Sequence, residues 1–149
     1  HLLGDIDLNS FDALAIPGGF EPSGYYDEAL SEEFLQVIRH FSERDQTVAS
    51  VCVSSLALGR AGVLKGRRAT TYHQVGGKRK QQLEATGAEF VDTPIVIDEH
   101  LITSTGPGTA LEVAFELLAR LSTIDNANIV REKMRIPKPS EAWYQKPQV

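Results

Sequence analysis

The chain has 149 residues, 42% of them hydrophobic, with one cysteine and a formal net charge of −5, which suffices for one domain with a single buried core. The acidic balance disfavours nucleic acid as a partner, since neutralised phosphates supply most of that affinity, and no apolar run approaches the ~18 residues that cross a bilayer. A lone cysteine excludes an intramolecular disulfide and, with no signal peptide in the sequence, predicts a cytoplasmic protein that contacts no membrane.

The N-terminal part of the chain predicts a buried strand, a glycine turn and a helix. Residues 11–16 form a short apolar run closed by Pro-Gly-Gly at 17–19, which is typical of a strand entering a tight loop. Ser31 is placed to cap a helix that extends to about residue 44, because acidic residues fill its first turn and apolar residues recur at helical spacing.

A second buried strand is predicted over residues 47–51, and Cys52 follows it directly. Residues 54–61 predict a helix that ends at Gly62, since glycine is the residue type that most often closes a helix. Cys52 therefore stands between a strand and a helix start.

The second half of the chain alternates short strands with helices and ends in a tail, residues 134–149, that is predicted to be mobile or docked on a partner. The predicted strands are 68–72, 88–91, 95–98 and 101–104, and the predicted helices are 78–86, the segment that 106–109 opens and that extends to 121, and 125–133.

This alternation predicts an α/β protein with a mostly parallel sheet. In such sheets, reactive groups gather beyond the carboxyl ends of the strands. The sequence therefore predicts one site at one edge of the sheet. The residues that reach that edge are Gly18, Gly19, Cys52, His73, Thr105 and Gly106.

Cys52 is the candidate nucleophile. A residue between a buried strand and a helix start is held in a sharp, strained turn with its side chain above the sheet. The helix N-terminus adds backbone N–H groups and positive partial charge, which lower the pKa of a thiol and favour the thiolate. An isolated cysteine is most often a small buried apolar residue, but the position of Cys52 favours the functional interpretation.

The glycine pair and His73 are the next candidates. Gly18 and Gly19 can point backbone N–H groups into the site, as an oxyanion hole requires. His73 is placed to act as a general acid or base, or as a partner of the thiolate; the alternative is a histidine that only caps a strand end. No cluster of residues has metal-ligand spacing, so no metal is expected.

The pocket wall is predicted from residues beside these groups. Thr105 and Gly106 follow a strand at the same sheet edge, and Gly18 belongs to the wall through its place next to Gly19. The hydroxyl of Ser54 either donates into the site or caps the helix, and the sequence leaves both alternatives open.

Four motifs occur in a fixed order, at residues 11–19, 48–52, 66–71 with His73, and 101–110. Together they resemble the ThiJ/PfpI superfamily, which is related in fold to the class I glutamine amidotransferases. The resemblance covers about residues 11–121 and implies a flavodoxin-like three-layer sandwich that is usually dimeric.

The same resemblance implies roles for particular residues. Cys52 would be the cysteine of a nucleophile elbow, and the amides of Gly19 and Val53 would be the oxyanion donors. His73 would be the histidine near the thiol.

The chain departs from the superfamily pattern before the first motif. The strand, helix and strand that normally precede it are absent, together with an early Glu or Asp that hydrogen-bonds the cysteine. We therefore expect residues 1–149 to form a single domain that lacks this segment and has an exposed sheet edge. Its expected partner is a second copy of the chain, as a homodimer, or a chain that carries the segment.

Two departures lie beside the cysteine itself. Val53 takes the place of the histidine that directly follows the cysteine in PfpI-type proteases, which disfavours peptidase activity. Ser54 occupies the second position after the cysteine, where a small residue is usual, and alters the oxyanion pocket.

Three functions remain open. The first is a cofactor-independent enzyme, a hydratase or glyoxalase, in which the Cys52 thiolate attacks an electrophilic carbon of a small molecule. The second is a redox-sensing or chaperone-like stress protein that uses oxidation of Cys52. The third is the sensory domain of a transcriptional regulator, which the lack of a helix-turn-helix pattern after residue 121 disfavours.

Overall fold

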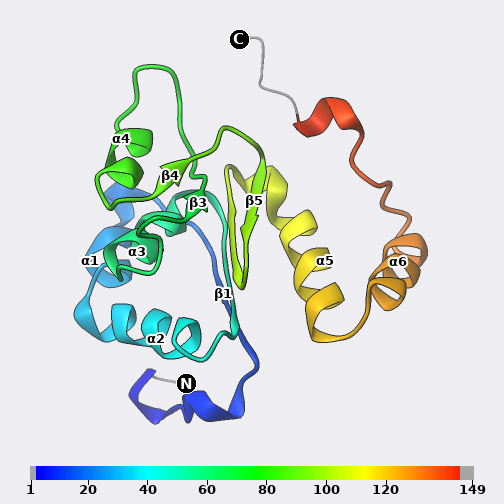
Figure 1. The fold of residues 1–149 in the computed structure, drawn as a ribbon, viewed down its shortest axis with the longest axis horizontal. Coiled ribbons are helices and arrows are strands. Elements are labelled where there is room, and N and C mark those ends of the chain that lie inside the picture. Colours follow the sequence, from blue (N-terminus) through cyan, green and yellow to red (C-terminus); the bar gives the residue numbers. More distant parts are fainter. Residues whose placement is uncertain (1–2, 145–149) are drawn as a thin grey trace.

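A four-stranded sheet forms the centre of the structure, a computed structural model that describes residues 3–144 (Figure 1). The strand order is β1-β2-β6-β5, with β1 parallel to β2, β2 parallel to β6, and β5 antiparallel to β6. The register pairs Leu14 with Val48 and Ala49 with Ile102. The four strands are β1 (Ala13–Ile16), β2 (Thr47–Ser50), β5 (Ile95–Asp98) and β6 (Leu101–Ser104).

The segment predicted as a strand over 68–72 does not join this sheet. Only β3 (Arg68–Ala69) pairs, and it pairs in parallel with β4 (Glu89–Phe90) as a separate two-stranded sheet. The amide of Thr70 donates to the side-chain oxygen of Thr103 on β6 at 2.9 Å. That hydrogen bond ties the segment to the sheet through a side chain instead of a backbone ladder.

Helices cover both faces of the sheet. Figure 1 shows α1, α2 and α3 on one side and α5 on the other, with α6 packed outside α5. The fold is therefore α/β with a mostly parallel sheet between helices, the flavodoxin-like arrangement that the sequence predicts. Within residues 3–144, the α-helices are α1 (Tyr25–Ala29), α2 (Glu32–Ser42), α3 (Ser55–Arg60), α4 (Arg79–Glu84), α5 (Ala110–Leu121) and α6 (Ile124–Lys133).

The larger core lies between the sheet and helices α2 and α3. Its fully buried members include Ile38, Phe41, Val48 and Leu58. A smaller core under α5 joins Ala49, Ile102 and Val113. Ser31 caps α2 as predicted, because its side chain accepts a hydrogen bond from the amide of Phe34.

The C-terminal segment folds back on the outer helices. Arg131 of α6 is buried, pairs with Glu112 of α5 at 2.5 Å, and donates to the carbonyl of Pro137 at 3.2 Å. Residues Glu141–Tyr144 form a short 3-10 helix. Residues 145–149 of the predicted tail lie outside the described residues, and its docking on a partner stays a prediction.

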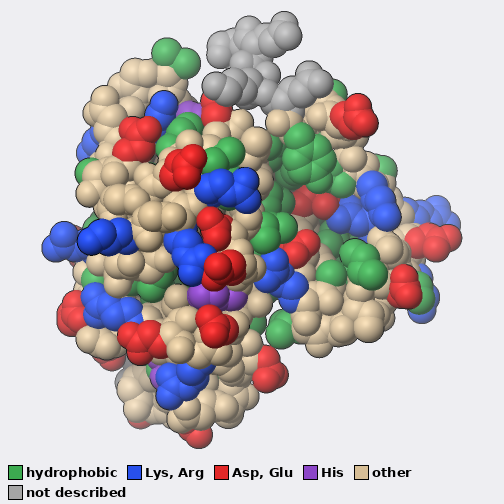
Figure 2. Space-filling model, viewed as in Figure 1, with side chains coloured by type: hydrophobic (Ala, Val, Ile, Leu, Met, Phe, Trp, Pro, Cys, Tyr) green, Lys and Arg blue, Asp and Glu red, His purple; other side chains and the backbone are tan. Residues whose placement is uncertain are grey.

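The surface carries charges of both signs. On the face shown in Figure 2, basic and acidic side chains are interspersed and not gathered by sign. Within residues 3–144, no helix is long and apolar enough to cross a bilayer.

Candidate functional site

Cys52 lies on a strained turn between β2 and α3. Its φ is +65°, a value that L-residues rarely adopt, while the preceding Val51 is extended with φ −116°. A short 3-10 helix, Cys52–Ser54, leads directly into α3. This is the strand-to-helix geometry that the sequence predicts, and the thiol is only partly buried.

The loop after β1 packs directly against this turn. A Cβ atom on Gly18 would lie 2.6 Å from the Cβ of Cys52 and 3.3 Å from its sulfur, so only glycine fits. Gly19 packs instead on the ring of Tyr25, where a Cβ would lie 2.2 Å from a ring carbon. Within residues 3–144, neither glycine amide donates to another backbone or side-chain acceptor, so both remain available to a ligand.

The carbonyl group of Cys52 is held by three donors. The amide of Tyr72 donates at 3.1 Å, the hydroxyl of Thr71 at 3.3 Å and the hydroxyl of Ser55 at 3.5 Å. Two of these donors come from the segment that follows β3. The strained turn is therefore fixed by residues about twenty positions further along the chain.

The thiol has a pKa above the ordinary value, which corrects the expected lowering. Burial raises the pKa of Cys52, and this effect exceeds the lowering by the amide of Val53 and by the positive charge of Arg79. The helix-start amide does donate to the sulfur, as expected, but desolvation outweighs it. Among the described residues, no carboxylate or imidazole hydrogen-bonds the sulfur.

The contacts of three further predicted pocket residues, Ser54, Thr105 and Gly106, are as follows in the structure. Ser54 is buried, and its hydroxyl donates to the carbonyls of Ile16 and Val51 at 2.9 and 2.7 Å, so it joins the two strand ends. Thr105 donates through its amide to Pro94 at 2.9 Å. Gly106 lies beside the ring of Tyr72, the residue whose amide contacts the carbonyl of Cys52.

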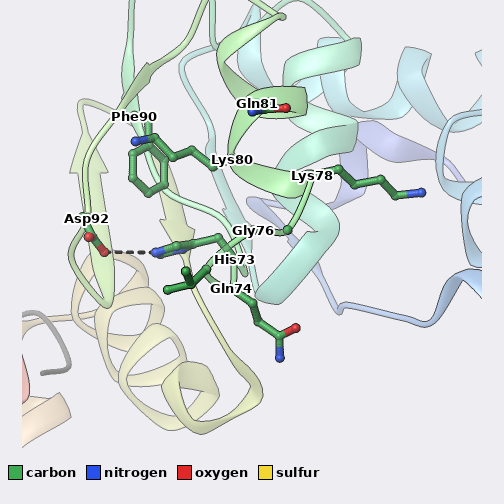
Figure 3. Close-up of a pocket in the computed structure, with 10 residues that line it drawn as sticks. His73, Gln74, Gly76, Lys78, Lys80, Gln81, Phe90 and Asp92 are labelled. Carbon is green, nitrogen blue, oxygen red and sulfur yellow. Dashed lines mark ion pairs between the residues drawn. The ribbon is translucent and has the colours of Figure 1, made fainter. Parts of the chain in front are cut away.

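His73 lines a cavity of about 860 Å³, whose other lining residues do not include Cys52 (Figure 3). Its Nε2 lies 3.1 Å from Asp92, its Nδ1 lies 2.9 Å from the carbonyl of Thr71, and its ring meets Phe90 edge-on at 5.0 Å. Both ring nitrogens therefore have partners other than Cys52, and the expected place of His73 near the thiol stays a prediction. A role for His73 in proton transfer stays a prediction.

Sequence reasoning passed over Thr71, Tyr25 and Arg79. Thr71 contacts the Cys52 carbonyl from 19 positions away, and Arg79 pairs with Glu21 across 58 positions. Arg79 belongs to a basic stretch that resembles a solvated helix face in the sequence. No local pattern distinguishes such long-range partners from exposed polar residues.

Metal ligands do not gather anywhere in residues 3–144, where no group of three or more His, Cys, Asp or Glu is placed to hold an ion. The chemistry that the arrangement offers is that of one thiol, free backbone amides and a nearby guanidinium.

Known proteins are similar to this chain in sequence and in fold. Residues 1–120 match the model of the DJ-1/PfpI family. The chain is 33% identical over 143 residues to Protein DJ-1 homolog A of Arabidopsis thaliana, covering 95% of this chain and 35% of that protein. It is 32% identical over 130 residues to the Glutathione-independent glyoxalase DJ-1 of Schizosaccharomyces pombe, covering 85% and 63% respectively.

The structure of Drosophila melanogaster DJ-1beta is similar in fold, with a TM-score of 0.77 and 28% sequence identity. The match covers 91% of this chain and 70% of that one. The chain thus spans about a third of the Arabidopsis relative and less than two thirds of the Schizosaccharomyces pombe relative.

Proposed function

The chain belongs to the DJ-1/PfpI family, and we propose that within it Cys52 is the nucleophile of a cofactor-independent enzyme acting on small reactive carbonyl compounds. The relative named as a glutathione-independent glyoxalase supports an α-oxoaldehyde as the substrate class. This substrate class favours the glyoxalase over the hydratase, the other reaction that the sequence leaves open.

One observation carries the proposal. The sulfur of Cys52 is presented at φ +65° beside Gly18, with the amide of Val53 donating to it. A strained backbone conformation persists only where the surrounding structure fixes it, and such positions cluster at reactive sites. Three hydrogen bonds to the Cys52 carbonyl supply that fixation.

The chemical step follows from the groups present. The thiolate sulfur forms a bond to the aldehyde carbon, and the carbonyl π electrons move to oxygen, giving a hemithioacetal alkoxide. The amides of Gly19 and Val53 are the proposed donors to that oxygen. A proton from water or from His73 neutralises the alkoxide. A base then removes the proton on the carbon bound to sulfur, and return of a proton to the neighbouring carbonyl carbon through an enediol gives a 2-hydroxyacyl thioester. Water adds to the thioester carbonyl and the carbon–sulfur bond breaks, which releases the hydroxy acid and the Cys52 thiol.

The raised pKa of Cys52 requires a base for this step. We propose that a carboxylate outside this protomer accepts the thiol proton, supplied either by a second copy of the chain or by a chain that carries the segment preceding the first motif. Supporting this, β1 is an edge strand among the described residues, and Leu111 and Leu121 of α5 are half exposed. Sedimentation of the chain alone tests for self-association.

The redox-sensing alternative receives less support. A sensor cysteine depends on a resting thiolate, which is the species that oxidants attack. Burial raises the pKa of the Cys52 thiol and so favours its protonated form. An enzyme can instead remove the proton only when substrate is bound.

The test is the consumption of methylglyoxal with and without Cys52. We expect the wild-type assembly to form lactate without glutathione and Cys52→Ala to lose that activity. Cys52→Ser is the matched control, because it keeps size and polarity but removes the nucleophilic sulfur. Equal lactate formation by wild type and Cys52→Ala would sink the proposal.

A further inference from the structure

Arg79, the first residue of α4, pairs with Glu21. Glu21 closely follows Gly18 and Gly19, the glycine loop after β1 that packs on Cys52. Arg79 pairs through its Nη2 with Glu21 at 2.7 Å, its Nη1 donates to Gln82 at 2.9 Å, and its guanidinium stacks 4.6 Å from the centre of the Tyr26 ring. Its side chain is only 18% exposed. These contacts hold a long cationic side chain in one position.

Two series of contacts connect Arg79 to Cys52. Glu21 follows Gly18 by three residues, and Gly18 touches the sulfur-bearing side chain of Cys52. Tyr25 packs on Gly19 and donates to the carbonyl of Pro17 at 2.9 Å. Tyr25 also meets the ring of Tyr26 edge-on at 5.3 Å, and Tyr26 carries the guanidinium.

Two positive charges face one negative charge at Glu21. Glu21 is shared by two cations, since Lys78 lies 3.2 Å from its other oxygen. Among residues 3–144, the charged and titratable groups that bear on the thiol are Tyr25 and Tyr26 from α1 and Arg79 from α4. Burial raises the pKa of Tyr25 to about 12 and raises the pKa of Tyr26, so both tyrosines are neutral near pH 7. Arg79, held by Glu21 and by the Tyr26 ring, is therefore the cation that these contacts link to the loop packed on Cys52.

We propose that Arg79 is a positioning residue for Cys52: clamped by Glu21 and Tyr26, its guanidinium supplies the positive charge that favours the thiolate on the strained turn. Glu21 opposes this effect by neutralising part of that charge while it holds the guanidinium in place. The inference deepens the proposed function, because it concerns the reactivity of the same thiol, but its test requires no substrate.

The experiment measures alkylation of Cys52 by iodoacetamide, an uncharged reagent, as a function of pH. We expect Arg79→Met to slow alkylation near neutral pH by about two- to fivefold, the size of effect typical of partly exposed charge pairs, and to move the profile to higher pH. Arg79→Lys keeps the charge and stays near wild type. Arg60→Met, the same substitution in the cavity of about 510 Å³ that Arg79 also lines, leaves the rate unchanged.

Glu21→Gln separates the effect of charge on the alkylation rate from the effect of losing the ion pair. It breaks the same ion pair as Arg79→Met but removes a negative charge, so alkylation stays as fast as wild type or becomes faster. Equal slowing by Glu21→Gln and Arg79→Met would show that the ion pair matters only as a structural link and would overturn the proposal. An unchanged profile for Arg79→Met would overturn it too.

A second measurement covers the case in which Arg79→Met unfolds. Salt screens partly exposed charges, so raising ionic strength slows alkylation of the wild-type protein and not that of free cysteine in the same buffer. An absence of salt dependence overturns the proposal. If Cys52→Ala retains glyoxalase activity while alkylation still follows Arg79, the proposed function fails and this inference stands.

Discussion

The amide of Tyr72 donates a hydrogen bond of 3.1 Å to the carbonyl oxygen of Cys52. With the hydroxyl of Thr71, it ties the strained turn to the segment that continues into His73 and the neighbouring cavity. Hydrogen bonds thus link the backbone of the candidate nucleophile to the segment that leads into the wall of that cavity. A change that removes the hydrogen bond from Thr71 should therefore alter the reactivity of the thiol.

Thr71→Val tests this connection. Both Thr70 and Thr71 are fully buried, but within the described residues only Thr71 uses its hydroxyl, which donates to the Cys52 carbonyl. We expect Thr71→Val to lower the free energy of unfolding by about 1 kcal/mol and to change the alkylation rate of Cys52. Thr70→Val is the control and should be neutral or stabilising, since it removes a buried hydroxyl without a partner. Urea unfolding measures both; equal losses in the two variants would refute the role of Thr71.

The positive φ of Cys52 predicts an unusual response to glycine. Non-glycine residues in the left-handed region cost roughly 1–2 kcal/mol, while φ at this position is +65°. Cys52→Gly should therefore be as stable as Cys52→Ala or more stable, by up to about 1 kcal/mol, although glycine normally destabilises by a similar amount. Thermal unfolding of the two variants checks this. A glycine variant less stable than the alanine variant would mean that the turn is unstrained in solution.

The sequence predicts the turn at Cys52 because its causes are local. A buried apolar run, one cysteine and a helix start stand next to one another, and the preceding glycine pair closes the neighbouring strand. The structure confirms the α/β fold and the strand-to-helix turn for that reason. It also shows that Gly18 packs against Cys52, whereas Gly19 packs on the ring of Tyr25.

The errors involve competition between distant groups. The sequence shows that a helix start favours the thiolate but not how much of the thiol is desolvated, and burial reverses the direction of the pKa shift. It places His73 at a strand end but not the carboxylate of Asp92, 19 residues later, that holds its ring. Residues 70–72 have the composition of a strand, yet hydrogen bonds to Cys52 and Thr103 replace the ladder.

Gly18→Ala tests the close approach of the glycine loop. A methyl group there would meet the Cβ of Cys52 at 2.6 Å and the carbonyl of Val51 at 3.0 Å, so the loop or the turn must shift. We expect a loss of about 1–3 kcal/mol in unfolding free energy together with altered thiol reactivity. Gly108→Ala is the matched control, because a Cβ there meets nothing within 4 Å. Similar stability of the two variants would contradict the close contact between Gly18 and Cys52.

Alkaline pH should weaken the fold through Cys52 and Tyr25. Burial raises both pKa values above their ordinary values of 9.0 and 10.0, to about 12 for Tyr25. Because the folded state holds these protons more tightly, their stabilising contribution is complete below the unfolded pKa and is lost as pH rises through the folded pKa. Urea unfolding should show a smaller alkaline loss in Cys52→Ala from about pH 9 and in Tyr25→Phe from about pH 10. Parallel losses in the wild type and both variants would contradict the shifts.

His73 allows thiol reactivity to be separated from turnover. Its Nδ1 faces the carbonyl of Thr71 and its Nε2 faces Asp92, so neither nitrogen contacts the sulfur of Cys52. We therefore expect His73→Gln to leave the alkylation rate of Cys52 within about twofold of wild type, an effect no larger than that of a weak exposed charge pair. Asp92→Asn, which keeps the size of the side chain, is the matched control.

Turnover gives the opposite expectation if His73 transfers a proton to the bound substrate. General acid–base catalysis contributes about 100-fold or more, so His73→Gln should cut methylglyoxal consumption by that factor while alkylation is unchanged. This split is possible only if the ring leaves Asp92, or acts through a water, once substrate is bound. Asp92→Asn weakens the hold on the ring and should therefore change turnover far less than His73→Gln. Slowed alkylation in His73→Gln would show that the ring reaches the free thiol in solution, whereas unchanged turnover would remove His73 from the reaction.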